Sequence, residues 1–152
     1  MDLFKKAAIE DARKEIMEKR GEGCVCPVCD QFVKVYKRKI NAILAKQLLM
    51  AHRKYESQWF HIRDMDYFTT DWAVLHHFDL ITPQPHNAGD EGKKSSGWWK
   101  ITARGAAFCQ KEIEIFSHIL VYNNEMIGFS GTHVSIDDCL GAKFDYNELM
   151  NA

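Results

Sequence analysis

Several features that define other protein classes are absent from this sequence. No run of eighteen apolar residues occurs among the 152 residues, and no apolar segment follows the charged start, so we expect neither a membrane span nor a signal peptide. Internal repeats and low-complexity tracts are also absent. The composition, with 46% hydrophobic, 12% aromatic and 27% charged residues, is typical of a folded protein with an aromatic core. We therefore expect one main domain in a cytoplasmic protein.

The chain also lacks the basic excess that proteins use to cover a phosphate backbone. Twenty Lys and Arg stand against twenty-one Asp and Glu, which gives a formal net charge of -1. The charges are unevenly distributed, because residues 24–105 hold twelve basic and eight acidic residues, whereas residues 106–152 hold two and seven. We expect these regions, at +4 and -5, to face different partners.

Helical periodicity is clearest in the first half of the chain. Apolar residues recur at every fourth position over residues 2–20, and Gly21 and Gly23 follow, which predicts an N-terminal helix. A second apolar stripe predicts a longer helix from about Tyr36 to about Glu56. The closely spaced cysteines between these two helices suit a tight turn.

Shorter elements are predicted in the rest of the chain. They are a strand residue or two with one helical turn over 59–68, a short helix over 70–80, an exposed loop over 83–97, a strand over 98–101, a helix over 102–113, hairpin strands over 119–122 and 125–129, a third strand over 132–136 and a last helix over 146–150. Thr70 and Thr102 are the expected helix caps, and Asn123 with Asn124 forms the expected hairpin turn. The sequence predicts an α+β fold of four parts. These are an N-terminal helix (1–23), a cysteine turn (24–35), a central domain (36–116) and a C-terminal β-hairpin with a short helix (117–152).

Two stretches on either side of the polar loop carry a family resemblance. Residues 75–82 read Leu-His-His-Phe-Asp-Leu-Ile-Thr, and residues 97–108 read Gly-Trp-Trp-Lys-Ile-Thr-Ala-Arg-Gly-Ala-Ala-Phe. This order resembles winged-helix regulators, in which a recognition helix ends in a Gly-Leu-Ile-like triplet, a hairpin wing follows, and a Leu-Thr-x-x-Gly-like step opens the next helix. Asp79 stands where that family has glycine, while Thr102 and Gly105 match the step. The resemblance implies a winged helix-turn-helix core; an unrelated α+β domain is the alternative.

The whole chain also resembles small proteins of phages and prophages. The matching features are the cysteine turn, the stretch Gln-Phe-Val-Lys-Val-Tyr-Lys-Arg at residues 31–38 and the end Phe-Asp-Tyr-Asn-Glu-Leu-Met at residues 144–150. This resemblance implies a phage-derived origin and no particular activity.

The winged-helix resemblance implies contacts with DNA, which a recognition helix reads near its start while basic side chains hold phosphates. The expected recognition helix carries no Arg, Lys, Asn or Gln for base contacts, and its Asp71 would repel phosphate. Basic residues instead gather at residues 34–39 and in the predicted wing tip. The predicted nucleic-acid contacts are Lys34, Lys37, Arg38, Lys39, Thr70, His77, Lys93 and Lys94. Each basic cluster by itself is equally well interpreted as solvated surface charge.

Two binding functions follow, and the fold class does not decide between them. We favour a phage-derived DNA-binding protein that is regulatory and weakly sequence-specific. The alternative is a module that binds and modulates a host protein, for example a component of host defence. We do not expect an enzyme, because the sequence contains no Gly-rich phosphate loop, no His-Glu-x-x-His and no nucleophile elbow. The apolar stripe of the N-terminal helix would serve a homodimer or pack on its own domain.

The cysteine turn is the candidate metal site. Cys26-Pro27-Val28-Cys29 has the spacing of a zinc knuckle, and Cys24 is close enough in sequence to be a third ligand. The fourth ligand is unassigned, because no second Cys-x-x-Cys occurs and none of the seven His has an obvious ligand spacing. A plain cysteine-bearing turn without metal is the other interpretation. Cys109 and Cys139 are single, which is typical of buried apolar cysteine.

Overall fold

The computed structural model describes residues 3–65, 69–85, 96–123 and 125–151, with side chains from Ala8 onward. These residues form a mixed α+β fold, as the sequence predicts. The chain divides into two compact units. Unit 1 comprises residues 1–38 and 120–128, and unit 2 comprises residues 39–119 and 129–152.

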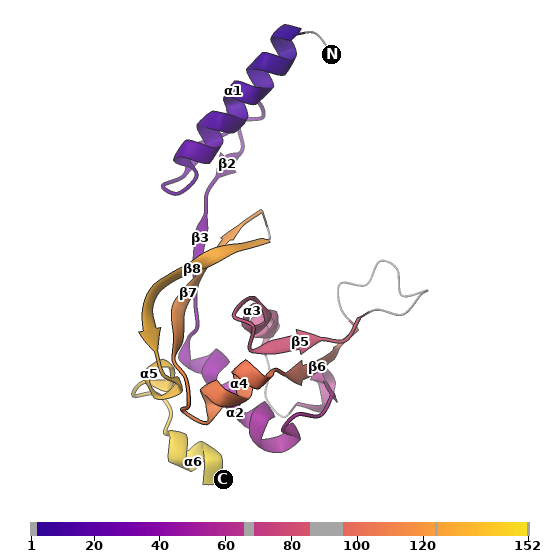
Figure 1. Ribbon diagram of the computed structural model, residues 1–152, viewed down its shortest axis with the longest axis vertical. Helices are drawn as coiled ribbons and strands as arrows, with labels where there is room; N and C mark the ends of the chain where they lie inside the picture. The colour runs from indigo at the N-terminus through magenta and orange to yellow at the C-terminus, as the bar shows by residue number, and fades with distance from the viewer. Residues whose placement is uncertain (1–2, 66–68, 86–95, 124, 152) are drawn as a thin grey trace. The chain divides into compact units, whose positions relative to one another are not determined.

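Unit 1 begins with a helix and a small hairpin (Figure 1). The helix α1 (Leu3–Lys19) confirms the predicted N-terminal helix, and Lys19 pairs with Glu15 at 2.9 Å in its last turn. The strands β1 (Cys24–Val25) and β2 (Phe32–Val33) follow as an antiparallel pair. The predicted cysteine turn (24–35) therefore contains a small hairpin, and the turn itself, which holds Cys26 and Cys29, joins its two strands.

The next segment corrects the prediction of a helix starting near Tyr36. Residues Tyr36–Lys39 form the strand β3, and the helix α2 (Ala42–Tyr55) begins six residues later. Asn41 caps α2 by accepting a hydrogen bond from the Leu44 amide at 2.8 Å. The β3 segment gains its backbone partners from a distant strand, β7 (Ile115–Tyr122), and local periodicity cannot reveal such pairing.

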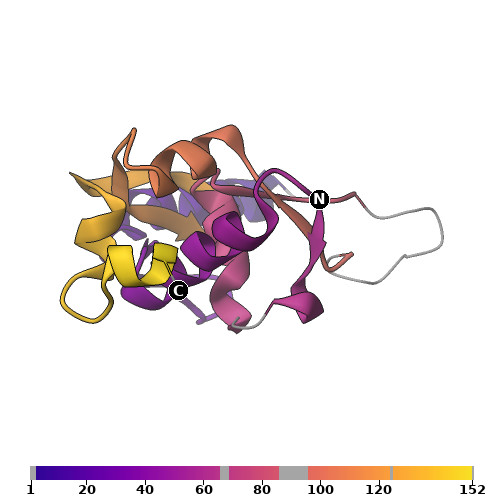
Figure 2. The same cartoon turned by 90° about the horizontal axis from the view of Figure 1, so that it is seen from below.

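Helix α2 is the centre of unit 2. It contacts the helix α4 (Ala103–Cys109), the helices α5 (Ile136–Leu140) and α6 (Tyr146–Asn151), and the strand β6 (Trp98–Ile101), as Figures 1 and 2 show from two directions. The largest fully buried side chains lie around it and include Trp72, Phe78, Phe108, Leu48 and Leu49. The aromatic core expected from composition lies in this unit.

A three-stranded antiparallel sheet covers part of this core. Its strands are β4 (Phe60–His61), β5 (Ile81–Pro83) and β6, in the order β4-β6-β5. Between β4 and β5 lie the 3-10 turns η1 (Ile62–Asp64) and η2 (Thr70–Ala73) and the short helix α3 (Val74–His77). The predicted helix over 70–80 is thus split into a 3-10 turn and a single α turn.

The junction between α3 and β5 explains two sequence features. Asp79 has the left-handed φ of 61° that the winged-helix resemblance assigns to glycine at this place. Thr102 caps α4 as predicted, and its hydroxyl also donates to the Asp79 carbonyl at 2.7 Å. Gly105 lies against the Leu80 backbone, so closely that a Cβ atom would collide with the Leu80 carbonyl oxygen. The predicted extension of this helix to residue 113 is wrong, because α4 ends at Cys109.

The last part of the chain agrees with the sequence except at one strand. β7 and β8 (Glu125–Val134) are neighbours in a sheet of order β3-β7-β8, and Asn123 has the expected positive φ of 51°. Asn124 lies outside the described residues. The predicted third strand over 132–136 is wrong, since β8 continues to Val134 and Ser135 then caps α5. The last helix is confirmed as α6.

Among the residues that the structure describes, every helix is too short or too polar to cross a membrane.

Candidate nucleic-acid interface and cysteine turn

The outer face of the β4-β6-β5 sheet carries exposed aromatic residues. Trp98 on β6 pairs in register with His61 on β4, and their rings meet edge to face at 5.2 Å. Trp59 directly precedes β4, and the Lys100 ammonium lies 5.6 Å from the centroid of its ring. Trp59 is 42% exposed and Trp98 is 41% exposed. We call Trp59, His61, Trp98 and Lys100 the aromatic face.

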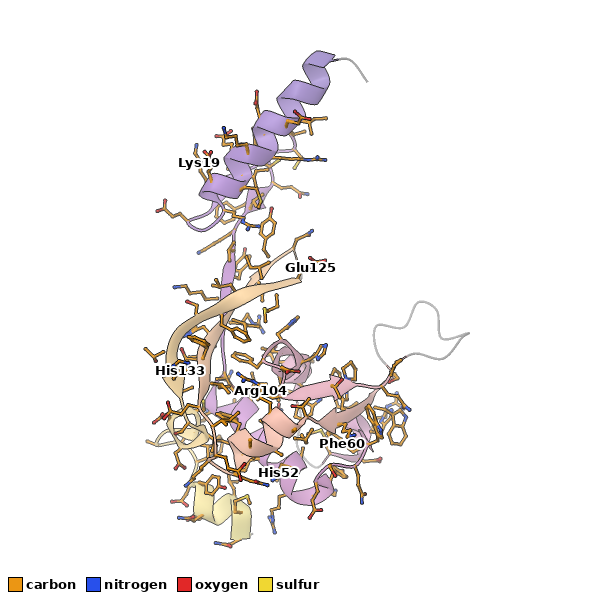
Figure 3. The ribbon with its side chains drawn as sticks, viewed as in Figure 1. Lys19, His52, Phe60, Arg104, Glu125 and His133 are labelled. Carbon is orange, nitrogen blue, oxygen red and sulfur yellow. The ribbon has the colours of Figure 1, made fainter. Side chains whose placement is uncertain are left out.

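The inner face of the same strands holds the aromatic face in place. Side chains alternate along a strand, so Phe60 and Trp99 point to the opposite side, where both are buried. Phe60, labelled in Figure 3, stacks on Tyr55 at 4.5 Å and meets Trp72 edge to face at 6.0 Å. Trp72 in turn meets Trp99 at 6.4 Å. These buried ring contacts hold β4 and β6 against α2 and η2.

Gly97 lets the strand β6 approach β4 closely. Its φ is 80°, and a Cβ atom there would lie 2.5 Å from Nε2 of His61. Its carbonyl oxygen accepts a hydrogen bond from the Ile62 amide at 2.8 Å. The aromatic face was not among the predicted site residues. The alternation of Trp98 with Trp99, and of Trp59 with Phe60, is the signal that could have found it.

The two predicted contacts of the recognition helix lie on one short segment. Thr70 begins η2 and is exposed, whereas His77 ends α3 and is half-buried, with its ring 6.3 Å from that of His76. His76 is held by the Ile81 carbonyl oxygen at 3.1 Å. Arg104 of α4 donates to the Phe78 carbonyl oxygen at 3.3 Å, which ties the end of this segment to α4 (Figure 3).

The structure separates the predicted basic contacts. Lys34, Lys37 and Arg38 are exposed in unit 1, and Lys39 is exposed in unit 2. The segment is anchored by the Val35 amide, which donates to the Arg20 carbonyl oxygen at 2.8 Å. The other predicted contacts, Lys93 and Lys94, lie outside the described residues. Of the predicted contacts that the structure describes, Lys39, Thr70 and His77 share unit 2 with the aromatic face.

The cysteine turn is closed by backbone hydrogen bonds. The Cys26 amide donates to the Gln31 carbonyl oxygen at 2.7 Å, and the Asp30 amide donates to the Cys26 carbonyl oxygen at 3.0 Å. Asp30 takes a left-handed φ of 62°, which reverses the chain after Cys29. The amide of Cys29, and then that of Val28, donate to the Cys26 sulfur and lower the pKa of its thiol, to which the Cys29 side chain also contributes a hydrogen bond.

Two of the three predicted metal ligands are brought together. Cys26 and Cys29 share a hydrogen bond across the turn, whereas Cys24 lies in β1, paired with Val33. No group of three or more His, Cys, Asp or Glu suited to a metal occurs in the part of the chain that the structure describes. The two sulfurs fit half of a tetrahedral zinc site, and zinc stays a prediction.

The remaining cysteines lie in unit 2, where Cys109 is buried as predicted and Cys139 is half-buried. Cys109 of α4 is fully buried, and burial raises its pKa. Burial raises the pKa of Cys139 in α5 to about 12. Such thiols are poor nucleophiles at neutral pH.

A pocket of about 600 Å³ opens between α2, β6 and α4. Its polar lining includes His52, Glu56, Lys100 and Gln110. Burial lowers the pKa of His52, and the nearby Glu56 carboxylate partly offsets this by raising it. No sequence pattern predicted this pocket, because its lining comes from α2, β6 and α4 together with Met150 of α6.

No family model, no curated protein and no solved structure matches this chain.

Proposed function

We propose that residues 42–109 form a winged-helix module that binds DNA with weak sequence specificity. The order of elements supports this proposal. Helix α2 is followed by β4, the η2–α3 segment, the strands β5 and β6, and α4. The sheet order β4-β6-β5 places the first strand beside the third, so that β5 and β6 act as the two strands of a wing. The left-handed Asp79 and the cap at Thr102 stand where the resemblance requires them.

The observation that carries the DNA proposal is the aromatic face. Indole rings can pack against the sugars of a duplex backbone, and a neighbouring ammonium neutralises phosphate. Trp59 and Trp98 keep about two fifths of their surface in contact with solvent, although burying that surface would favour folding. Exposed aromatic residues beside His61 and Lys100 are typical of a binding surface.

The same geometry accounts for weak specificity. The η2–α3 segment offers no Arg, Lys, Asn or Gln that could form bidentate contacts with base edges. Contacts through the wing strands and through Lys39 would be made mainly to the backbone, and these carry little sequence information. A phage-derived regulatory protein of this kind would recognise the shape of the duplex and the charge of its backbone more than the base sequence.

Fluorescence anisotropy with a labelled random duplex tests this function. We expect binding at low salt. The logarithm of the binding constant should fall linearly with the logarithm of the salt concentration, with a slope of roughly -0.9 per neutralised phosphate. Trp98→Ala should weaken binding several-fold, because it removes apolar surface that would pack against the sugars of the duplex backbone. Phe129→Ala is the matched control, since Phe129 is 40% exposed but lies on β8, away from the aromatic face.

Two results would count against DNA binding. One is no binding to duplex at low salt, and the other is an equal loss in the Trp98→Ala and Phe129→Ala variants. The first result would favour the alternative, a host protein as partner, because exposed Trp is enriched in the energetic centres of protein interfaces. A pull-down from nuclease-treated host lysate that is lost in Trp98→Ala and kept in Phe129→Ala would then support that alternative.

A further inference from the structure

Unit 1 has almost no core of its own. Of the buried apolar residues in the described chain, only Ala12 and Cys26 belong to it. Its exposed large apolar residues are Met17, Val25, Val28, Phe32, Tyr36 and Ile127. A unit of this size needs a metal, a disulfide or a partner to hold one structure. The cysteine turn is the place in unit 1 where such support can be attached.

The turn has the geometry of half a metal site. Cys26 and Cys29 lie within hydrogen-bonding contact, and the backbone amides of the turn point at the Cys26 sulfur. A structural zinc ion takes four ligands in a tetrahedron. The described residues supply no third ligand beside these two sulfurs. Two ligand positions must therefore be filled from outside this turn.

Exposed apolar side chains lie beside the two cysteines, of which Cys29 is exposed and Cys26 is buried. Val25 and Phe32 face each other across the hairpin, and they are 59% and 62% exposed. Val28, between the two cysteines, is 65% exposed. Asp30 is the only charged residue among residues 24–33, so two such surfaces would not repel each other strongly.

We propose that Cys26 and Cys29 of two copies of this chain bind one zinc ion and join the copies through the hairpins β1–β2. A two-fold axis through the metal brings four sulfurs to one ion, with no ligand of another kind. The same operation places Val25, Val28 and Phe32 of one copy near those of the other, where they are removed from water. Each of the four thiols releases its proton to solvent when its sulfur binds zinc.

This site does not depend on DNA binding. Its residues lie in unit 1, whereas the aromatic face lies in unit 2. Its consequence is that the protein carries two copies of unit 2 per zinc ion, as a reader of paired sites requires.

The test measures zinc content and mass of the full chain, purified with zinc and again after chelation. We expect one zinc ion per two chains and twice the 17.6 kDa mass of the single chain, and a monomer once zinc is removed. Cys26→Ser and Cys29→Ser should each abolish zinc binding and dimerisation. Cys24→Ser is the matched control, and it should retain both. Substitution by cobalt should give the absorption spectrum of a tetrahedral site with four thiolates.

Three outcomes would overturn the proposal. They are one zinc ion per monomeric chain, no zinc at micromolar concentration, and a dimer that persists after chelation or in Cys26→Ser. Folding of each variant is checked in both units: Trp fluorescence reports on unit 2, which holds all four Trp residues, and the helical signal of α1 in far-ultraviolet circular dichroism reports on unit 1.

A further variant tests the apolar contact without removing a sulfur. Val28→Asp should raise the dimer dissociation constant at least tenfold, because it places a charge on each side of the contact. An unchanged dissociation constant would contradict the arrangement of hairpins proposed for the dimer.

Discussion

Unit 2 and unit 1 use apolar side chains in opposite ways. In unit 2, residues from helices, strands and turns meet in one interior, with Trp72, Phe78 and Phe108 fully buried. In unit 1, side chains of comparable size, such as Phe32 and Tyr36, lie on the surface. The described residues of unit 2 therefore bury the side chains that stabilise it, whereas those of unit 1 leave most of their large apolar side chains exposed to solvent. Fold and function divide along the same line, because the aromatic face belongs to unit 2 and the cysteine turn to unit 1.

The largest effect on stability is expected when one phenylalanine is removed from each unit. Phe108→Ala should lower the free energy of unfolding by about 3–5 kcal/mol, because it leaves a cavity in the core of unit 2. Phe32→Ala should change it by less than about 0.5 kcal/mol in the zinc-free chain, since most of that ring is already in water. Urea midpoints from Trp fluorescence and far-ultraviolet circular dichroism measure both. Similar losses in the two variants would show that unit 1 has a core after all.

A second pair of variants compares glycines. Gly105→Ala should destabilise unit 2 by about 1–3 kcal/mol, because the new Cβ meets the Leu80 carbonyl oxygen and lies 3.0 Å from the Ile101 side chain. Gly21→Ala in unit 1 meets no atom within 4 Å and should lie within about 0.5 kcal/mol of the parent chain. Thermal unfolding of the two proteins gives the difference. A neutral Gly105→Ala would mean that α4 is free to shift away from β5.

The sequence predicted the elements whose causes are local. Thr102 caps the start of α4, Asp79 takes a left-handed φ shortly after α3 ends, and Asn123 takes a positive φ in the hairpin turn. The sequence did not predict the elements that form because of a partner far away in the chain. Tyr36–Lys39 is a strand because β7, almost eighty residues later, pairs with it, and the apolar stripe of α2 masked that boundary.

The candidate sites follow the same rule. Cys26 and Cys29 are close in sequence, and the tight turn expected there is present, whereas the strands on either side of it were not predicted. The aromatic face joins β4 to β6, which lie thirty-seven residues apart, so no local pattern pairs Trp98 with His61. The predicted DNA contacts rested on charge and on the winged-helix resemblance, and neither shows that Lys34 and Thr70 belong to different units.

A third prediction concerns the polar groups that unit 2 buries. Gln47 of α2 is fully buried, and its amide has no hydrogen-bond partner among the described atoms. Gln47→Met keeps the length of the side chain and removes the unpaired groups, so it should stabilise unit 2 by about 1 kcal/mol. Gln47→Ala, which leaves a cavity, is the control and should destabilise it. If Gln47→Met is clearly less stable than the parent, the amide has a partner that the described residues do not include.

The smallest expected effect is a difference between the units in how their stability depends on pH. All seven His lie in unit 2 and none lies in unit 1. Burial lowers the pKa of His52 from its ordinary value of 6.5, so the folded protein holds its proton less tightly than the unfolded chain. The neutral His52 thus contributes full stability above about pH 6.5, and this is lost as the pH falls through the lowered pKa. Urea midpoints of Trp fluorescence between pH 7.5 and pH 5, in roughly half-unit steps, should show a decrease that His52→Leu reduces.

The Glu56 carboxylate provides a second test of the His52 titration. Glu56 raises the pKa of His52 against the effect of burial, so Glu56→Gln should move the loss of stability to lower pH and make it larger. His52→Leu combined with Glu56→Gln should show no further change in pH dependence beyond His52→Leu alone, because the titrating ring is gone. An identical pH profile in the parent and in His52→Leu would show that another group in unit 2 controls its response to acid.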